Sequence, residues 1–471
     1  MENRILSPLE ARILPWLVAV AFFMQTLDAT ILNTALPAMA DSLHTNALQM
    51  QAVVISYMLT VALLIPASGW MTDRFGIRRV FMAAILVFTL GSLLCALSPS
   101  LPLITAARVV QGIGGALLAP VGRLSILKAY PREDLVSVLS FITIPGLIGP
   151  LLGPTLGGFL VKYATWHWIF LLNIPVGLLG AFATLRFMPE LPKPTKPEPF
   201  DRLGFALFGV AMIAVTMAFE GVGELGLALT PMVLLFIFGI VCLVAYCLHS
   251  LRAQYPLFNP EMFQIRNFTV GILGNLFARL GNGAMPFLTP LLLQVGLGFS
   301  PLKSGLTMIP MTLGAMLAKS IVRPLLNTIG YRGLLVANTL SLGLLIAAFS
   351  LIDRETPYLW LMILFSVFGV INSMQFTAMN TLTLIDIPQQ HAAGGNGMLS
   401  VVMQVSMGMG VACAAAILGE FSGLRTVPPP ADLLEAFHKT YICLGFLAAL
   451  SAAIFFHARH SDGKHAESSG H

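Results

Sequence analysis

The hydrophobic positions of this chain fall into long continuous runs that are separated by short polar stretches. The runs are about twenty residues long, the length of an α-helix that crosses about 30 Å of hydrocarbon. Fourteen runs can be identified, at residues 13–35, 49–70, 79–98, 102–124, 136–160, 167–187, 203–220, 229–249, 269–294, 302–323, 333–351, 358–380, 393–417 and 438–457. The pattern predicts an all-α polytopic membrane protein with fourteen transmembrane helices.

The polar stretches divide the runs into groups. Residues 188–202 (MPELPKPTKPEPFDR) are charged and rich in proline, which indicates a linker that is not helical throughout. A second polar connection, at 252–268, follows two further runs. This 6+2+6 order is typical of a duplicated transporter with a two-helix insertion. We expect a six-helix bundle at 1–188, linkers and two inserted helices at 189–268, and a second six-helix bundle with a short tail at 269–471.

Composition and charge placement support the membrane assignment. Hydrophobic residues make up 57% of the chain and charged residues only 10%, against about a quarter in soluble domains. Nineteen lysines and arginines fall on one side of the predicted spans and five on the other, which predicts that both termini are cytoplasmic. The net charge of +5 is spread over short loops and forms no basic face, so we expect no nucleic-acid partner.

Catalytic and cofactor sites are not apparent. The five cysteines lie inside apolar runs without a histidine at a metal-site interval, and they are interpreted as small buried thiols. There are no paired carboxylates and no nucleophile triad, and no soluble segment could house an enzyme. We therefore expect neither a metal nor a cofactor, and no enzymatic activity.

Asp28 is an ionisable residue within the first run, with Gln25 one turn earlier on the same helical face. Placing such a residue at the centre of a membrane helix costs about 2.5–3.5 kcal/mol on insertion scales, so its presence indicates a structural or functional role. Burial favours the neutral acid, whereas a nearby cation favours the carboxylate. A carboxyl group under both influences can load and release a proton. The alternative is a structural ion pair or a hydrogen-bonded anchor.

Two arginines also lie within predicted spans. Arg108 is followed by Gln111, Gly112 and Gly115 on one helical face, so a cation, an amide and two close-packing positions coincide there. Arg279 lies between Asn275 and Asn282 in a polar stripe at the start of the second half. Asn372 and Gln375 form a weaker stripe. Arg279 could bind substrate or brace the fold, and the sequence favours neither.

Two glycine-containing segments are prominent. The first, GWMTDRFGIRR, is a tight cytoplasmic turn in which glycines permit close packing and the turn itself, and Asp73 can form a latch with neighbouring arginines; its candidate residues are Gly69, Asp73, Arg74, Gly76, Arg78 and Arg79. The second, GPLLGPTLGG, would bend a helix and admit a neighbour; its candidate residues are Gly149, Pro150, Gly153, Pro154, Gly157 and Gly158.

Together these segments resemble the major facilitator superfamily, specifically its fourteen-helix drug:proton antiporter branch (EmrB/QacA type). Residues 27–37 (LDATILNTALP) are similar to the first-helix signature of that branch, and 69–79 to the signature loop between helices two and three. Residues 108–116 resemble the fourth-helix signature, whose arginine is associated with proton transfer, and 149–158 the fifth-helix antiporter signature. The equivalent loop in the second half, NTIGYRG, lacks the aspartate, which puts a second latch in doubt.

The resemblance implies a major facilitator fold and a proton-coupled antiporter of the bacterial inner membrane, a secondary transporter that exports small amphipathic compounds or drugs by alternating access. Asp28 would carry the proton and Arg108 would bias its release. The expected partners are a small-molecule substrate, protons and the lipid bilayer, and the superfamily default is a monomer. Export of an endogenous metabolite and a non-transporting membrane sensor are the alternatives. The substrate and the proton stoichiometry are not encoded in any recognisable motif.

Overall fold

The computed structural model describes residues 7–130, 132–191, 199–224, 229–388, 392–422 and 430–458. The regular structure in these ranges is helical, and the helices form two compact units. Unit 1 contains residues 1–201 together with 300–306, and unit 2 contains 202–299 and 307–471. The division into two six-helix bundles and an inserted pair stays a prediction.

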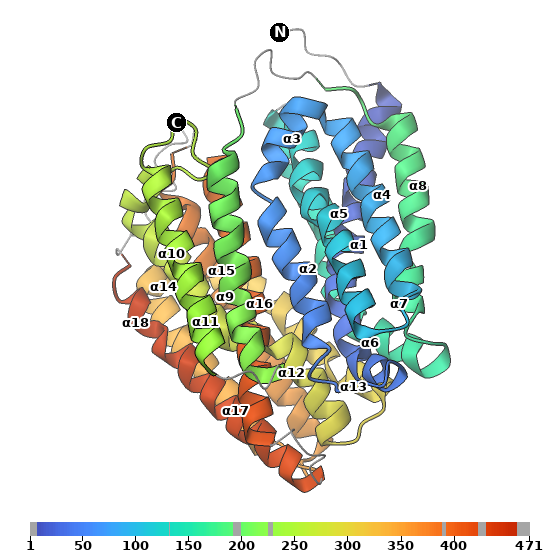
Figure 1. Ribbon diagram of the computed structural model, residues 1–471, viewed down its shortest axis with the longest axis vertical. Coiled ribbons are helices and arrows are strands. Elements are labelled where there is room, and N and C mark those ends of the chain that lie inside the picture. The colour runs from blue at the N-terminus through green and yellow to red at the C-terminus, as the bar shows by residue number, and fades with distance from the viewer. Residues whose placement is uncertain are drawn as a thin grey trace. The chain divides into compact units, whose positions relative to one another are not determined.

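The helices of unit 1 can be followed in blue and teal in Figure 1. They are α1 (Pro8–Ser42), α2 (Gln51–Leu64), α3 (Ala67–Phe75), α4 (Ile77–Ala96), α5 (Leu101–Ala129), α6 (Arg132–Tyr163), α7 (Trp168–Leu171) and α8 (Asn173–Phe187). Helix α1 begins with a capping box, in which the Ser7 hydroxyl accepts from the Glu10 amide at 3.3 Å and the Glu10 carboxylate accepts from the Ser7 amide at 3.0 Å. The α3–α4 turn is at Gly76, whose φ of 92° favours glycine.

Unit 2 contains the remaining helices, apart from the start of α13 (Pro301–Thr307), which packs with unit 1. They are α9 (Arg202–Glu224), α10 (Leu229–Ser250), α11 (Arg266–Asn282), α12 (Met285–Leu291), α14 (Ile309–Ala348), α15 (Tyr358–Ile385), α16 (Ala392–Ser422), α17 (Pro430–Leu450) and α18 (Ala452–Phe455). Helix α14 is broken at Gly330, which has φ 68° and ψ 170°. The break falls in the predicted loop between 323 and 333.

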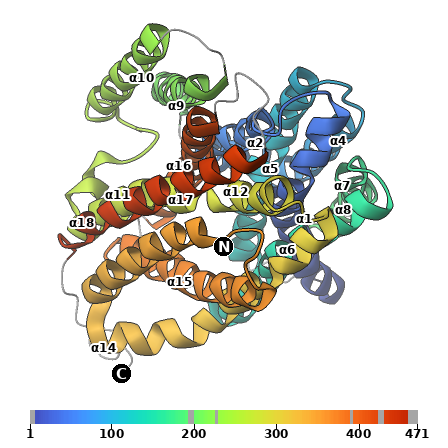
Figure 2. The same cartoon turned by 90° about the horizontal axis from the view of Figure 1, so that it is seen from below.

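Helices α9 and α10 pack against each other, and α9 also packs against α16. Figure 2 shows the two helices side by side. Only 22% of the most apolar window of α10 is buried, although this is the most hydrophobic span described, with a mean hydropathy of 2.7. An apolar helix that is so little covered by protein is suited to face lipid.

The described residues contain eleven helices that are long and apolar enough to cross a membrane, or twelve if α2 and α3, bent by 58°, form one span. The predicted count of fourteen is therefore not confirmed. The predicted spans at 136–160 and 269–294 are the two that do not qualify, although both are helical, on α6 and on α11–α12. Between Asn282 and Met285 the second of these is interrupted by a turn.

Large apolar side chains line both the interior and the outer surface. In unit 1, buried residues of α1, α2, α4 and α5 form one hydrophobic core around Val18, Val61, Phe88 and Leu118. On α8, by contrast, Leu179 and Phe182 are 70% and 64% exposed. Soluble proteins rarely expose contiguous apolar surface, so this outer surface fits a hydrocarbon environment.

Candidate functional site

Three charged side chains are buried in the described part of the chain: Asp28, Arg108 and Arg279. They are the three intramembrane charges that the sequence singles out. Asp28 on α1 and Arg108 on α5 belong to unit 1, and Arg279 on α11 belongs to unit 2. Each unit therefore has its own polar centre, and the two centres differ in charge.

The centre of unit 1 is an ion pair between Asp28 and Arg108. An Arg108 Nη1 atom donates to Asp28 Oδ2 at 2.6 Å, and both residues are only 1% exposed. Arg108 Nε donates to the carbonyl of Val53 on α2 at 3.2 Å. Because α1, α2 and α5 each contribute a group, the pair joins two consecutive helices to a third that follows much later in the sequence.

Amide and hydroxyl groups complete the coordination of the ion pair. Gln111 donates to Asp28 Oδ1 at 2.8 Å and accepts from Arg108 Nη1 at 2.7 Å. Asn173, at the start of α8, donates to the same carboxylate oxygen at 3.1 Å. The hydroxyl of Ser92 on α4 accepts from Gln111 and Asn173 at 2.8 and 3.2 Å. Buried polar networks of this kind are stable only when their members are satisfied.

The aromatic ring of Tyr57 covers the arginine, with the guanidinium carbon 4.2 Å from the ring centroid. This distance is typical of a cation–π contact. Sequence reasoning identified Asp28, Arg108 and Gln111 but not Asn173, Ser92 or Tyr57. A single amide or hydroxyl in an apolar run gives no periodic signal.

Gln25 was expected beside Asp28, but the structure does not bring it into this network. Its side-chain oxygen has no hydrogen-bond partner in the ranges described. The two glycines after Arg108 do act as predicted. A Cβ on Gly112 would come within 2.8 Å of Thr60, and one on Gly115 within 2.5 Å of the Tyr57 hydroxyl. Helix α2 can therefore approach the face of α5 that carries the arginine.

The segment 149–158 packs along α1 at the level of Asp28. A Cβ on Gly149 would lie 2.8 Å from the amide nitrogen of Leu27, and one on Gly157 would lie 2.5 Å from the carbonyl of Ile31. Gly153 faces Thr30 in the same way, and the Thr30 hydroxyl donates to the carbonyl of Gly149 at 3.4 Å. The predicted close approach is thus present. Pro154 and Gly158 pack against residues 300–306 of the same unit, and the side chain of Pro150 lies outside the described residues.

The predicted gating loop requires two corrections. Asp73 forms its ion pair with Lys128 of α5, at 3.7 Å, and not with the neighbouring arginines. The Arg78 side chain instead donates to the carbonyl of Leu185 and lies 3.9 Å from Glu190, while Arg74 and Arg79 are exposed. Gly69 is not a close-packing position, because a Cβ there would meet nothing within 4 Å. The linear sequence does not show that Lys128, on α5, is the partner of Asp73.

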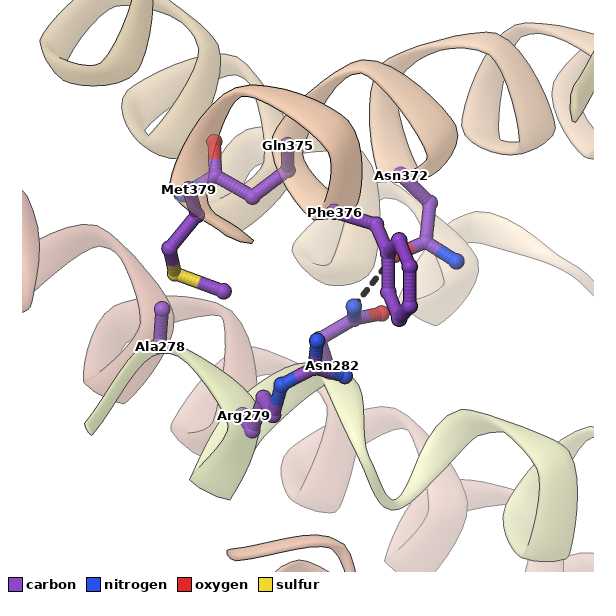
Figure 3. A pocket seen from close by; sticks show the side chains of 7 residues that line it. All are labelled: Ala278, Arg279, Asn282, Asn372, Gln375, Phe376 and Met379. Atoms are coloured by element: carbon purple, nitrogen blue, oxygen red, sulfur yellow. Dashed lines mark hydrogen bonds between the residues drawn. The ribbon is translucent and has the colours of Figure 1, made fainter. Parts of the chain in front are cut away.

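The polar centre of unit 2 gathers the remaining predicted residues. Arg279 Nε donates to Asn275 at 3.0 Å, and Asn282 donates to Asn372 on α15. Figure 3 shows Arg279, Asn282, Asn372 and Gln375 around one small pocket, which Ala278, Phe376 and Met379 complete. Gln375 is buried and is held by Asn338 and Thr339 at 2.9 and 2.8 Å.

Neither centre contains a metal site. In the described ranges no group of three histidine, cysteine or acidic residues lies close enough to hold a metal ion. Helix α16 is longer than the apolar run that predicts it. The predicted span ended at 417, but α16 extends to Ser422 and so includes Glu420, whose side chain is exposed.

Comparison with known proteins identifies the family. The sequence profile of the Major Facilitator Superfamily matches residues 18–411. The chain belongs to this superfamily. It is accordingly a membrane transporter and not an enzyme, and the resemblance of its motifs to this superfamily is confirmed.

Relatives of this superfamily member match it over almost its whole length. A protein of Serratia proteamaculans named "Putative multidrug resistance protein MdtD" is 49% identical over 441 residues, 93% of this chain and 92% of that protein. Proteins of the same name from Pectobacterium atrosepticum and Escherichia coli O157:H7 are each 47% identical, covering 95% and 93% of this chain and 96% and 93% of their own.

Solved structures show the fold alone. A bacterial homologue of the human lysosomal transporter Spinster has a TM-score of 0.68 at 15% identity, covering 96% of this chain and 97% of its own. A POT family transporter in complex with 5-aminolevulinic acid has a TM-score of 0.70 at 15% identity, covering 94% of this chain and 95% of its own. The major facilitator fold is therefore the fold of this chain.

Proposed function

We propose that this transporter is a proton-coupled antiporter that exports small amphipathic compounds or drugs by alternating access. The observation that carries the proposal is the buried Asp28–Arg108 pair at the centre of unit 1. The MdtD-named relatives support multidrug export as the class of activity.

The pair provides a reason for coupling protonation to conformation. An arginine keeps its charge in a protein, whereas an aspartate can become neutral by binding a proton. When Asp28 binds a proton, Arg108 loses its counter-ion while it remains surrounded by protein. A buried charge without a partner costs several kcal/mol. Proton binding therefore favours a second conformation in which the arginine is hydrated or differently paired, and proton release favours the first.

The surrounding groups limit the movement of the pair. Gln111 and Asn173 hold one carboxylate oxygen, while Arg108 holds the other. Three of the roughly four acceptor positions of the carboxylate are therefore occupied, which leaves one position on Oδ2 for a proton. The segment 149–158 of α6 packs against residues of α1 that precede and follow Asp28. A movement of the carboxylate is therefore transmitted to this contact between α1 and α6. This is how the antiporter segment would take part in bending.

The proposed topology has fourteen spans in the bacterial inner membrane, with both termini in the cytoplasm. Two six-helix bundles would move against each other, and the inserted pair, α9 and α10, would face lipid along α10. The uneven distribution of lysine and arginine supports the orientation. Cysteine labelling from each side of the membrane, at loop positions on a cysteine-free background, would contradict the topology if the two termini were labelled from opposite sides.

The activity can be tested in inverted membrane vesicles. Respiration fills the vesicles with protons, and a panel of cationic and amphipathic compounds is then added while the internal pH is followed. We expect at least one compound to release protons from wild-type vesicles and from Glu355→Gln, a matched loss of one exposed carboxylate. We expect no release with Asp28→Asn.

The opposite outcomes are also informative. Release that persists in Asp28→Asn would refute the assignment of the proton site. If the folded wild-type protein releases protons with no compound in the panel, drug export is contradicted. Release with endogenous metabolites would then favour a metabolite exporter, and binding without proton movement would favour a membrane sensor.

A further inference from the structure

The buried charges of the two units do not balance in the same way. In unit 1, Asp28 and Arg108 neutralise each other. In unit 2, Arg279 is only 6% exposed, and no described acidic side chain forms an ion pair with it. Because an arginine does not lose its proton in a protein, the fold keeps one net positive charge buried in unit 2.

The arginine is also incompletely hydrogen-bonded. Its Nε donates to Asn275, but its Nη2 is buried and has no acceptor in the described part of the chain. The guanidinium carbon lies 4.9 Å from the centroid of the Phe376 ring, which contributes a cation–π contact but accepts no proton in the plane of the guanidinium. An unsatisfied charged donor costs free energy, so its retention indicates a function.

The unsatisfied donor faces a pocket. The lining residues include Asn282, Asn372 and Gln375, and Figure 3 shows the side chains of Asn282 on α11 and Asn372 on α15 meeting beside Arg279. The Asn282–Asn372 hydrogen bond can be reversed by an amide flip, so either residue can present an N–H to a ligand. The far side of α11 is closed, because a Cβ on Gly410 of α16 would come within 2.9 Å of the Arg279 carbonyl. A ligand therefore meets the arginine from the α15 side.

We propose that this pocket binds an anionic group of the transported compound, with a planar carboxylate as the best match. A guanidinium can offer two parallel N–H donors to the two oxygens of a carboxylate, and Nη2 of Arg279 is a donor that has no acceptor in the described ranges. The amides supply further donors, and Phe376 and Met379 supply apolar contact for the adjoining carbon atoms. The free space in the pocket is about that of one water molecule, so the lining side chains have to move apart before a carboxylate enters, and a whole drug-sized molecule does not fit.

The inference rests on the proposed function for its substrate, but the site can be measured without transport. Sodium benzoate is the probe, and benzamide is its neutral counterpart of nearly the same shape. Binding is followed by calorimetry and by thermal stabilisation of the purified full-length protein at constant ionic strength. We expect saturable binding of benzoate to wild type, at least tenfold weaker binding of benzamide, and at least a tenfold loss of benzoate affinity in Arg279→Gln.

Two variants control for charge and folding. Arg354→Gln removes one positive charge from an exposed loop and is expected to bind benzoate like wild type. Arg279→Lys keeps the charge but loses the fork, and an intermediate affinity is expected. Benzoate binding that is absent in folded wild type, or equal in wild type and Arg279→Gln, would overturn the inference. If cationic compounds release protons but benzoate does not bind, the antiporter proposal stands and only the anion site is contradicted. If benzoate binds but no compound releases protons, the anion site stands and the antiporter proposal is contradicted.

Discussion

The ion pair of unit 1 makes a prediction about stability that separates the two partners. Asp28→Asn leaves Arg108 buried with a fixed charge and no counter-ion, a change that typically costs about 3–5 kcal/mol. Arg108→Gln leaves a carboxyl group that can neutralise itself by binding a proton. We therefore expect Arg108→Gln to destabilise the protein less than Asp28→Asn at neutral pH, although both remove the 2.6 Å contact.

The double variant Asp28→Asn/Arg108→Gln completes the cycle. Neither charge remains, and the two amides can hydrogen-bond to each other and to Gln111. We expect its free energy of unfolding to lie within about 1–2 kcal/mol of wild type, because exchanging a buried pair for neutral groups is often close to neutral. The coupling between the two sites should then be at least about 1 kcal/mol, which is in the range for residues in direct contact.

The assay is unfolding of the purified variants in one detergent, at one pH and ionic strength, followed by tryptophan fluorescence. Unfolding of a chain of this size is treated as a rate process, so the decisive result is the order of the midpoints. The predicted order is wild type close to the double variant, then Arg108→Gln, then Asp28→Asn. A double variant as unstable as Asp28→Asn would refute the reasoning, because it would mean that the two charges do not act as a pair.

Three further predictions concern packing. Gly153→Ala places a Cβ against α1 and should cost about 1–3 kcal/mol, whereas Gly397→Ala, with nothing within 4 Å of its Cβ, should be neutral or stabilising in the same melting assay. Gly76→Ala should cost about 1–2 kcal/mol because φ is 92°, while Gly69→Ala should gain about 0.5–1 kcal/mol from helix propensity; equal midpoints would contradict this. Tyr57→Phe keeps the ring over Arg108 and should change the midpoint little, whereas Tyr57→Ala should lower it clearly.

The sequence predicts the class of fold and the charged residues of both centres for a physical reason. A charge in an apolar run is costly, so Asp28, Arg108 and Arg279 stand out in a single sequence. The pairing of Asp28 with Arg108 cannot be read from the sequence, because the two residues are 80 positions apart and lie on helices that are not consecutive. Nothing in the sequence indicates that Arg279 lacks the partner that Arg108 has.

The sequence does not reveal the uncharged polar residues of the site. Asn173 and Ser92 are single hydrogen-bonding residues, which are common in membrane helices and become informative only when their partners are known. Gly69 shows the opposite error, since a glycine in a conspicuous motif was assigned a packing role that its open surroundings do not support. The count of fourteen spans stays a prediction, because the described helices support eleven or twelve and the segment at 269–294 is interrupted near Gly283.

Proton coupling at Asp28 is the central claim, and comparing two kinds of transport in proteoliposomes tests it most directly. The compound is one that releases protons in the vesicle panel. Counterflow exchanges labelled for unlabelled compound without a gradient, whereas uphill accumulation requires an imposed pH gradient. Asp28→Asn is predicted to retain counterflow and to lose accumulation, while wild type performs both. Accumulation by Asp28→Asn at the wild-type level would contradict the claim.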